Sequence, residues 1–185
     1  MYQSVKIQTM FIVVGLLFSL KCHAQMYQEK LHVPPEYSAV GQMVYKSYEH
    51  MYTELEKYVQ NNKRISKNDV DSVTQASIAE YYELNPQVKE AMSKNSSAEA
   101  TVQPDVQELL NAVVSVIKTF NPRKGIETLA DELGKINQKA TETLSTEDAE
   151  KIYSVTSVTY YSTIYWALSD KKWKKLRATI AEKNK

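Results

Sequence analysis

The segment from Ile152 to Ser169 constrains the fold of this chain more than any other, because it contains no charged residue, no glycine and no proline. Its side chains are apolar or hydroxyl-bearing in every direction, and a helix without a charged face is normally buried on all sides. Its serines and threonines fit such a helix, since their hydroxyls can bond to carbonyls one turn back. Ser145 and Asp148 supply a start signal of the capping-box type. We therefore predict a buried, uncharged central helix that ends near Ser169.

Four earlier segments carry apolar residues at three- and four-residue steps, the spacing of a helix with one buried face. Tight turns or proline-containing breaks separate most of them, as in helix bundles. No part of the chain predicts a strand. The sequence thus predicts an all-α, single-domain bundle of about five long helices within residues 37–183. The four segments are residues 37–61, 66–84, 104–120 and 126–140.

Two positions carry more specific predictions for the bundle. Gly134 lies inside a helical pattern, where glycine costs about 1 kcal/mol relative to alanine, so we expect it at a close helix crossing. Asp170 follows the central segment and can cap a separate last helix, from Lys171 to about Lys183.

Residues 1–24 have the pattern of a secretory signal peptide. Lys6 precedes an apolar run over residues 10–20, and Cys22-His23-Ala24 fits a cleavage site before Gln25. The run is shorter than the roughly 20 residues that span a bilayer. We therefore expect an exported protein, either periplasmic or extracellular. The alternatives are an uncleaved N-terminal anchor and a lipoprotein attached through Cys22, although the neighbouring Lys21 departs from the lipoprotein pattern.

Residues 25–36 are polar and end in Pro34-Pro35, which predicts an extended N-terminal arm.

The composition of the residues that follow the signal segment excludes several classes of protein. The chain has 23 Lys plus Arg and 22 Asp plus Glu, and two of the basic residues, Lys6 and Lys21, lie in the signal segment. The processed chain is therefore almost neutral, which argues against a nucleic-acid partner. Its lack of cysteine excludes disulfides, thiol catalysis and thiolate zinc sites.

Candidate catalytic and metal-binding residues are few. Glu29 and His32 have the Glu-x-x-His spacing of di-iron bundles, but such sites need a second copy and further glutamates. His50 is expected on the flank of a helix. Ser115 and Lys118 have a Ser-x-x-Lys spacing without the elements that accompany it in hydrolases. We therefore assign no catalytic, cofactor-binding or metal-binding residue and expect no cofactor.

Tyrosine is unusually frequent, and most of it lies in two predicted helices. One interpretation is an aromatic-lined groove that binds a small ligand or a partner through ring stacking and phenol hydroxyls. The other, which we favour, is a bundle core whose phenols reach the surface. The candidate groove residues are Tyr45, Tyr48, Tyr52, Tyr160, Tyr161, Tyr165 and Trp166.

A basic segment near the end of the chain has the composition of a helix that lies on a membrane interface, with Trp173 at the boundary. Four of its lysines would crowd the N-terminal end of the predicted last helix, where the helix dipole disfavours cations. This mismatch supports contact with an acidic surface or a membrane. The candidate contact residues are Lys171, Lys172, Trp173, Lys174, Lys175 and Arg177.

These observations favour a protein that is not an enzyme and that acts as an exported binding module for an unknown protein or small ligand. One alternative is a membrane-active or pore-forming protein that inserts Ile152–Leu168, guided by the basic segment. The serine, threonine and tyrosine hydroxyls of the Ile152–Leu168 segment make that insertion costly. A further alternative is an enzyme with an unrecognised site, which would require His50 and a carboxylate to meet in a pocket.

Overall fold

The computed structural model describes residues 29–87, 103–121 and 125–185, and every regular element within these ranges is helical. The elements are a short 3-10 helix η1 (Glu29–Leu31) and the α-helices α2 (Pro35–Asn61), α3 (Lys67–Leu84), α5 (Pro104–Thr119), α6 (Ile126–Thr143) and α7 (Thr146–Lys183). The helices pack against one another, which confirms the predicted all-α bundle with five long helices. The predicted signal segment 1–24, with Cys22, lies outside the described residues, so export stays a prediction.

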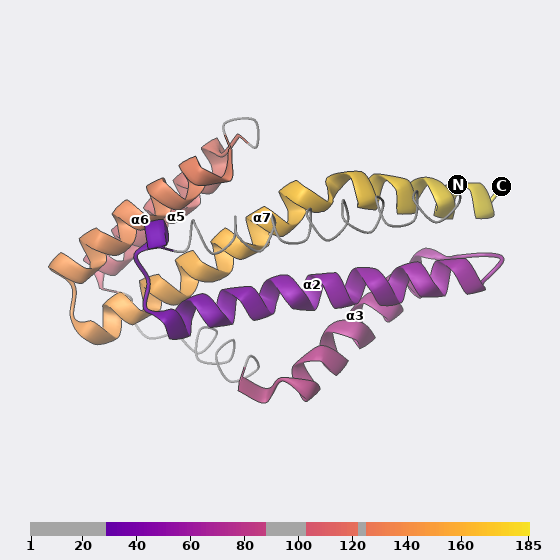
Figure 1. Ribbon diagram of the computed structural model, residues 1–185, viewed down its shortest axis with the longest axis horizontal. Helices are drawn as coiled ribbons and strands as arrows, with labels where there is room; N and C mark the ends of the chain where they lie inside the picture. The colour runs from indigo at the N-terminus through magenta and orange to yellow at the C-terminus, as the bar shows by residue number, and fades with distance from the viewer. Residues whose placement is uncertain (1–28, 88–102, 122–124) are drawn as a thin grey trace, which may run out of the picture.

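The long helix α7 runs through the whole length of the molecule (Figure 1). Helix α2 lies beside it in the same direction, since successive residues of α2 contact successive residues of α7 from Ser157 to Lys183. Helix α3 turns back along the other side of α2. Helices α5 and α6 pack on the first half of α7, at the opposite end from the C-terminus (Figure 1).

The predicted helix boundary after Ser169 is wrong, because α7 continues without a break to Lys183. Asp170 does not cap a new helix; its carboxylate pairs with Lys174 one turn later, at 2.8 Å. Beyond Ser169 the inward face continues through Trp173 and Leu176, which pack against α2 and α3. The basic segment therefore lies in the C-terminal half of a long helix, and the unfavourable helix-dipole position that the sequence suggested does not exist.

Two hydrophobic clusters divide the core along α7. The first joins η1, α5, α6 and the first half of α7, as far as Ile164. The second joins the end of α2, the start of α3 and the end of α7, around Leu55, Val59, Ile65 and Leu176. Because α5 and α6 cover only the first half of α7, the predicted burial on all sides stops near Trp166 and Leu168, which are both 46% exposed.

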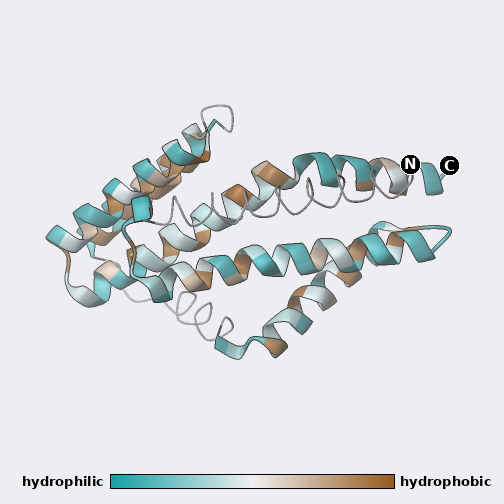
Figure 2. Ribbon diagram, viewed as in Figure 1, coloured by the Kyte–Doolittle hydropathy of each residue, from teal (hydrophilic) through white to brown (hydrophobic). Residues whose placement is uncertain are grey.

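Hydrophobic residues alternate with hydrophilic ones along the described helices (Figure 2). Among these helices none is both long and apolar enough to cross a membrane.

The close approach predicted at Gly134 is confirmed, and its partner is η1. A Cβ atom at this position would overlap the carbonyl oxygen of Lys30. The buried amide of Asn137, one turn later on α6, donates a hydrogen bond to the Leu31 carbonyl at 2.7 Å. Leu31 itself is completely buried. The residues that precede α2 are thus fastened to α6 by backbone contact as well as by an apolar side chain.

Candidate functional site

A row of aromatic rings fills the interface between α2 and the middle of α7. It comprises Tyr45, Tyr48, Tyr52, Tyr165, Trp166 and Trp173, and we refer to it as the aromatic row. The tyrosines of α2 recur at three- and four-residue steps, which places them on the side of that helix that faces α7. Neighbouring ring centroids lie 5.1–5.7 Å apart, the separation at which aromatic pairs attract each other.

Tyr165 is the centre of this row. Its hydroxyl donates to the backbone carbonyl of Tyr48 at 3.0 Å and accepts a hydrogen bond from Trp173 Nε1 at 3.1 Å. The side chain is nearly inaccessible to solvent, and burial raises its pKa. These two hydrogen bonds fix the orientation of the Tyr165 ring.

The other two predicted groove residues lie elsewhere. Tyr160 and Tyr161 are buried in the first core cluster. The Tyr161 hydroxyl bonds to Ser38 Oγ at 3.1 Å and accepts from Gln42 Nε2 at 3.2 Å. These two tyrosines therefore join the start of α2 to α7, whereas five of the seven predicted groove residues come together in the aromatic row.

A pocket of about 260 Å³ opens next to the row, between α2 and α7. Tyr52 and Tyr165 form its aromatic walls. Sequence reasoning did not assign Glu49, Thr53 or Ser169 to a groove, although Glu49 and Ser169 each lie three or four residues from a groove tyrosine on the same helix. The lining residues are Glu49, Tyr52 and Thr53 of α2 and Tyr165, Ser169 and Lys172 of α7.

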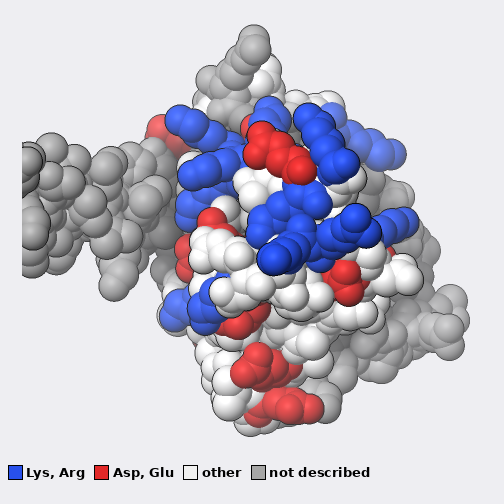
Figure 3. All heavy atoms as spheres, turned by 90° about the vertical axis from the view of Figure 1, so that its right-hand side faces the viewer, with Lys and Arg blue, Asp and Glu red and all other residues white. Residues whose placement is uncertain are grey.

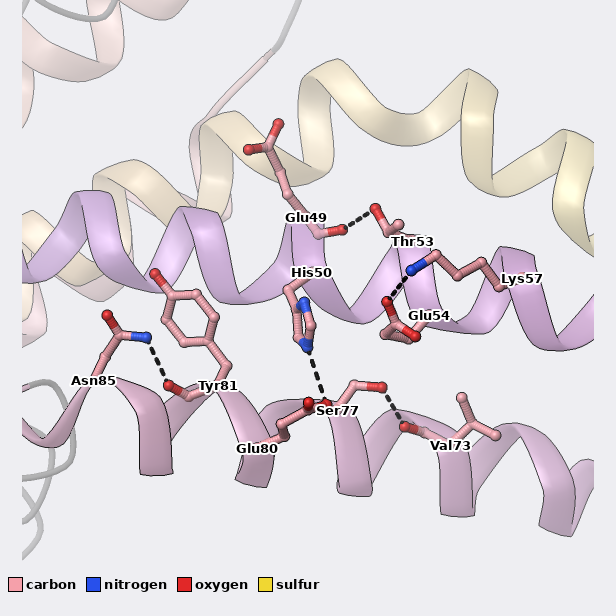
Figure 4. A network of polar contacts seen from close by, with 10 residues as sticks. All are labelled: Glu49, His50, Thr53, Glu54, Lys57, Val73, Ser77, Glu80, Tyr81 and Asn85. Atoms are coloured by element: carbon pink, nitrogen blue, oxygen red, sulfur yellow. Dashed lines mark hydrogen bonds and ion pairs between the residues drawn. The ribbon is translucent and has the colours of Figure 1, made fainter.

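The pocket places opposite charges on facing helices. The Glu49 carboxylate points away from α3 toward α7 (Figure 4), and Lys172 projects from α7 with its Nζ 5.9 Å from the centre of the Tyr52 ring. Within the described part of the chain, neither charge has a salt-bridge partner, and Lys172 does not pair with Glu49. The two groups are exposed, so each can bind an ion without first breaking an internal ion pair.

The polar groups deeper in the pocket differ in how well they are satisfied. Thr53 Oγ1 donates to the Glu49 carbonyl at 2.9 Å (Figure 4). Ser169 is 5% exposed, and among the described residues its Oγ meets no hydrogen-bond partner in good geometry. The Ser169 hydroxyl lies close enough to the Tyr165 hydroxyl to lower the pKa of that phenol, against the larger effect of burial.

The tyrosines around the pocket are held in their neutral form. Burial raises the pKa of Tyr45 to about 12, and the nearby Glu49 carboxylate adds to the effect. Burial together with the hydrogen bond to Glu56 raises the pKa of Tyr52 to about 12. Of these two tyrosines only Tyr52 lines the pocket, and its phenol is neutral at neutral pH.

His50 does meet a carboxylate, as the enzyme alternative requires, but not in this pocket. Its Nε2 lies 3.4 Å from Glu80 Oε2 across the seam between α2 and α3 (Figure 4). Glu80 is 60% exposed, and Tyr81 covers the other side of the imidazole ring. This contact is a surface link between two helices.

The other histidine considered in the sequence, His32, lies in the turn between η1 and α2, exposed and with a φ angle of 51°. The described residues contain no group of three or more histidine, cysteine or carboxylate side chains that could hold a metal ion.

The basic segment lies beyond the pocket on α7. Trp173 is directed into the aromatic row, and Lys174 pairs with Asp170. Lys171, Lys175 and Arg177 are exposed, and no carboxylate of the described chain pairs with them.

No protein-family model, curated protein or solved structure matches this chain.

Proposed function

We propose that this protein is an exported, non-enzymatic binding module that holds a small zwitterionic molecule in the pocket between α2 and α7. The observation that carries the proposal is the pair of opposite charges of Glu49 and Lys172, which line one pocket from two helices and have no salt-bridge partner among the described residues. A ligand with a cationic and an anionic group would place the first at Glu49 and the second at Lys172. Export rests on the sequence pattern of residues 1–24.

The remaining lining residues support a ligand of this chemical class. Tyr52 and Tyr165 offer aromatic surface to an apolar stem, and the ring faces attract a cationic group. The volume of about 260 Å³ lies below the usual range for drug-sized ligands, which favours a molecule as small as a single amino acid.

The same residues favour binding over catalysis. Among the described residues neither histidine nor cysteine lines the pocket, and the Tyr165 hydroxyl is fixed by Tyr48 and Trp173. A reaction by general acid–base chemistry needs titratable groups whose pKa values are set apart within hydrogen-bond reach of one another. The pocket instead separates its carboxylate and its ammonium group on two helices, which suits the recognition of charge at both ends of a ligand.

The fluorescence of Trp166 and Trp173 provides a direct test, because both indoles lie in the aromatic row. The free amino acids are titrated individually, together with their amides, which lack the carboxylate, and their N-acetyl forms, which lack the ammonium group. We expect a saturable change with at least one free amino acid and a loss of about tenfold or more in affinity for both derivatives, the scale of a charged hydrogen bond.

Substitutions identify the site. Glu49→Gln and Lys172→Gln should each lower the affinity about tenfold or more. Glu142→Gln and Lys46→Gln are the matched controls, because they remove the same charges at exposed positions outside the pocket. The proposal fails if no free amino acid gives a saturable change, or if the pocket variants bind as tightly as the controls.

A further inference from the structure

One end of the molecule carries six exposed cations without an ion-pair partner in the described part of the chain. Three belong to the turn between α2 and α3 and to the first residue of α3, and three belong to the second half of α7. Figure 3 looks at this end and shows Lys and Arg side chains clustered across its upper part with a few acidic side chains among them, whereas its lowest part shows acidic side chains and no basic ones. We call these residues the basic end: Lys63, Arg64, Lys67, Lys171, Lys175 and Arg177.

The fold, rather than the sequence order, brings the two groups together. Asn184 forms two hydrogen bonds to the backbone of Ile65, one at 3.1 Å to the amide and one at 2.6 Å to the carbonyl. Lys183 donates to the carbonyls of Val59 and Asn62 and so caps the end of α2. Ile65 and Leu176 are buried together beneath this surface. The basic end is therefore a rigid surface, because its two segments are fixed by hydrogen bonds and a shared core.

Five lysines elsewhere in the molecule are paired, whereas within the described part of the chain the exposed Lys46 and Lys118 are unpaired, like the cations of the basic end. Lys30, Lys57, Lys135, Lys139 and Lys151 each have a carboxylate partner within 4 Å. The described α5 and α6 carry the acidic residues Asp105, Glu108, Glu127, Asp131, Glu132 and Glu142. Within the described part of the chain, unpaired cations are thus most numerous at the C-terminal end, and acidic residues are frequent on α5 and α6.

We propose that the basic end docks onto the surface of an anionic lipid membrane. Each lysine or arginine close to such a surface contributes binding free energy without needing a shaped site, so a rigid group of unpaired cations from two segments matches an extended layer of phosphates. Four of the six are lysines, which bind phosphate as point charges and do not need the planar geometry that arginine requires.

The proposal describes docking at the surface and leaves α7 in the bundle. Trp173 is engaged by Tyr52 and Tyr165, and Leu176 is buried, so the inward face of this part of α7 stays in the core. This inference does not rest on the ligand proposed above. The test of membrane docking and the test of ligand binding can therefore give independent results.

Co-sedimentation with lipid vesicles tests the proposal. The full-length protein is mixed with vesicles of phosphatidylcholine alone or of phosphatidylcholine with about one third phosphatidylglycerol, at low salt and at about 0.5 M salt. We expect binding to the anionic vesicles at low salt, little binding to the neutral ones, and release at high salt. Any affinity of residues 1–24 is common to all variants, so the comparison between variants removes it.

The decisive comparison uses two double variants with the same change in net charge. Lys171→Gln with Lys175→Gln removes two cations of the basic end, and should lower the partition coefficient about 25-fold, or about fivefold per residue. Lys46→Gln with Lys118→Gln removes two exposed, unpaired lysines elsewhere, and should lower it much less. Lys63→Gln with Arg64→Gln should behave like the first pair, because the turn belongs to the same surface.

Several outcomes would overturn the proposal. Equal losses in the basic-end and control variants would mean that only net charge matters. Binding to soluble inorganic polyphosphate with no binding to anionic vesicles would assign the surface to a soluble polyanion. Release of a trapped dye from the vesicles would indicate insertion of α7 and not docking at the surface. Glu49→Gln should leave vesicle binding intact, which separates this result from the test of the pocket.

Discussion

Thr156 on α7 donates a hydrogen bond to the side-chain oxygen of Asn137 on α6 at 2.8 Å, and neither residue is accessible to solvent. The amide nitrogen of Asn137 donates in turn to the carbonyl of Leu31. A single buried side chain therefore connects η1, α6 and α7. Such a connection is specific in a way that apolar packing is not, because a buried polar group left without a partner is costly.

The first prediction concerns this connection. Asn137→Ala leaves the Leu31 carbonyl without its partner, and we expect a loss of about 1–3 kcal/mol in the free energy of unfolding. Thr156 keeps its other hydrogen bond, to the Ile152 carbonyl, and so does not add a second orphaned group. Denaturation by urea measures the loss. Asn111→Ala on the exposed face of α5 is the control and should change the stability by less than about 0.5 kcal/mol; equal losses would contradict the role of Asn137.

The second prediction concerns the close contact at Gly134. Alanine would normally stabilise a helix interior by about 1 kcal/mol. Here the added Cβ overlaps the backbone carbonyl of Lys30, which cannot move as the end of a flexible side chain can. We therefore expect Gly134→Ala to destabilise the protein by a net amount of about 1–2 kcal/mol, the scale of an overpacked core. A more stable variant in thermal denaturation would show that η1 does not hold this position.

The third prediction tests the continuity of α7. A proline at the first position of a helix is tolerated, whereas a proline in a helix interior costs about 3 kcal/mol or more. If a separate helix began at Lys171, then Lys171→Pro would be nearly neutral. Because α7 runs unbroken through Lys171, we expect the variant to lose about 3 kcal/mol and part of its helical circular dichroism. Lys171→Ala controls for the loss of the charge and should retain the wild-type stability.

The fourth prediction concerns alkaline pH. The pKa of Tyr45 and that of Tyr52 are raised to about 12, mainly by burial, against about 10 for an exposed tyrosine. The folded state thus holds these protons more tightly than the unfolded state does. Their contribution to stability is complete below about pH 10 and is lost as the pH rises toward about 12.

Tyrosinate absorbance during a pH titration measures this effect. In the folded protein we expect part of the tyrosine signal to appear only near pH 12, together with the loss of helical structure. The chain unfolded in urea should titrate in one step near about pH 10. Tyr45→Phe should reduce the late step. A folded protein that titrates like the unfolded chain would contradict the burial of these rings.

Local signals in the sequence predicted several helix boundaries that the structure confirms. Ser66, at the predicted start of the second helix, forms a capping box with Asp69, and its amide donates to Asp69 Oδ2 at 2.7 Å. Pro104 begins α5, and Ser145 caps α7 by accepting from the Asp148 amide at 3.2 Å. These features depend on residues within one helical turn, so the sequence alone contains the information.

Contacts between distant residues decided what the local signals could not. The charge-free segment and the basic segment looked like separate helices, yet Trp173 and Leu176 pack in the same interface as Ser169, and this shared packing favours one continuous helix over a capped break. Helix packing also determines where the tyrosines of α7 lie. Tyr165 contacts Tyr48 in the aromatic row, whereas Tyr160 lies in the first core cluster.

By itself the sequence determined a helical bundle, the caps of its helices and the composition of its aromatic and basic segments. Only the tertiary structure decided that Glu49 and Lys172 line one pocket, and that the turn after α2 joins the end of α7 at Lys183 and Asn184. The reason is physical: helix formation depends on neighbours three and four residues apart, whereas a pocket or a charged surface depends on which helices pack together and in which direction.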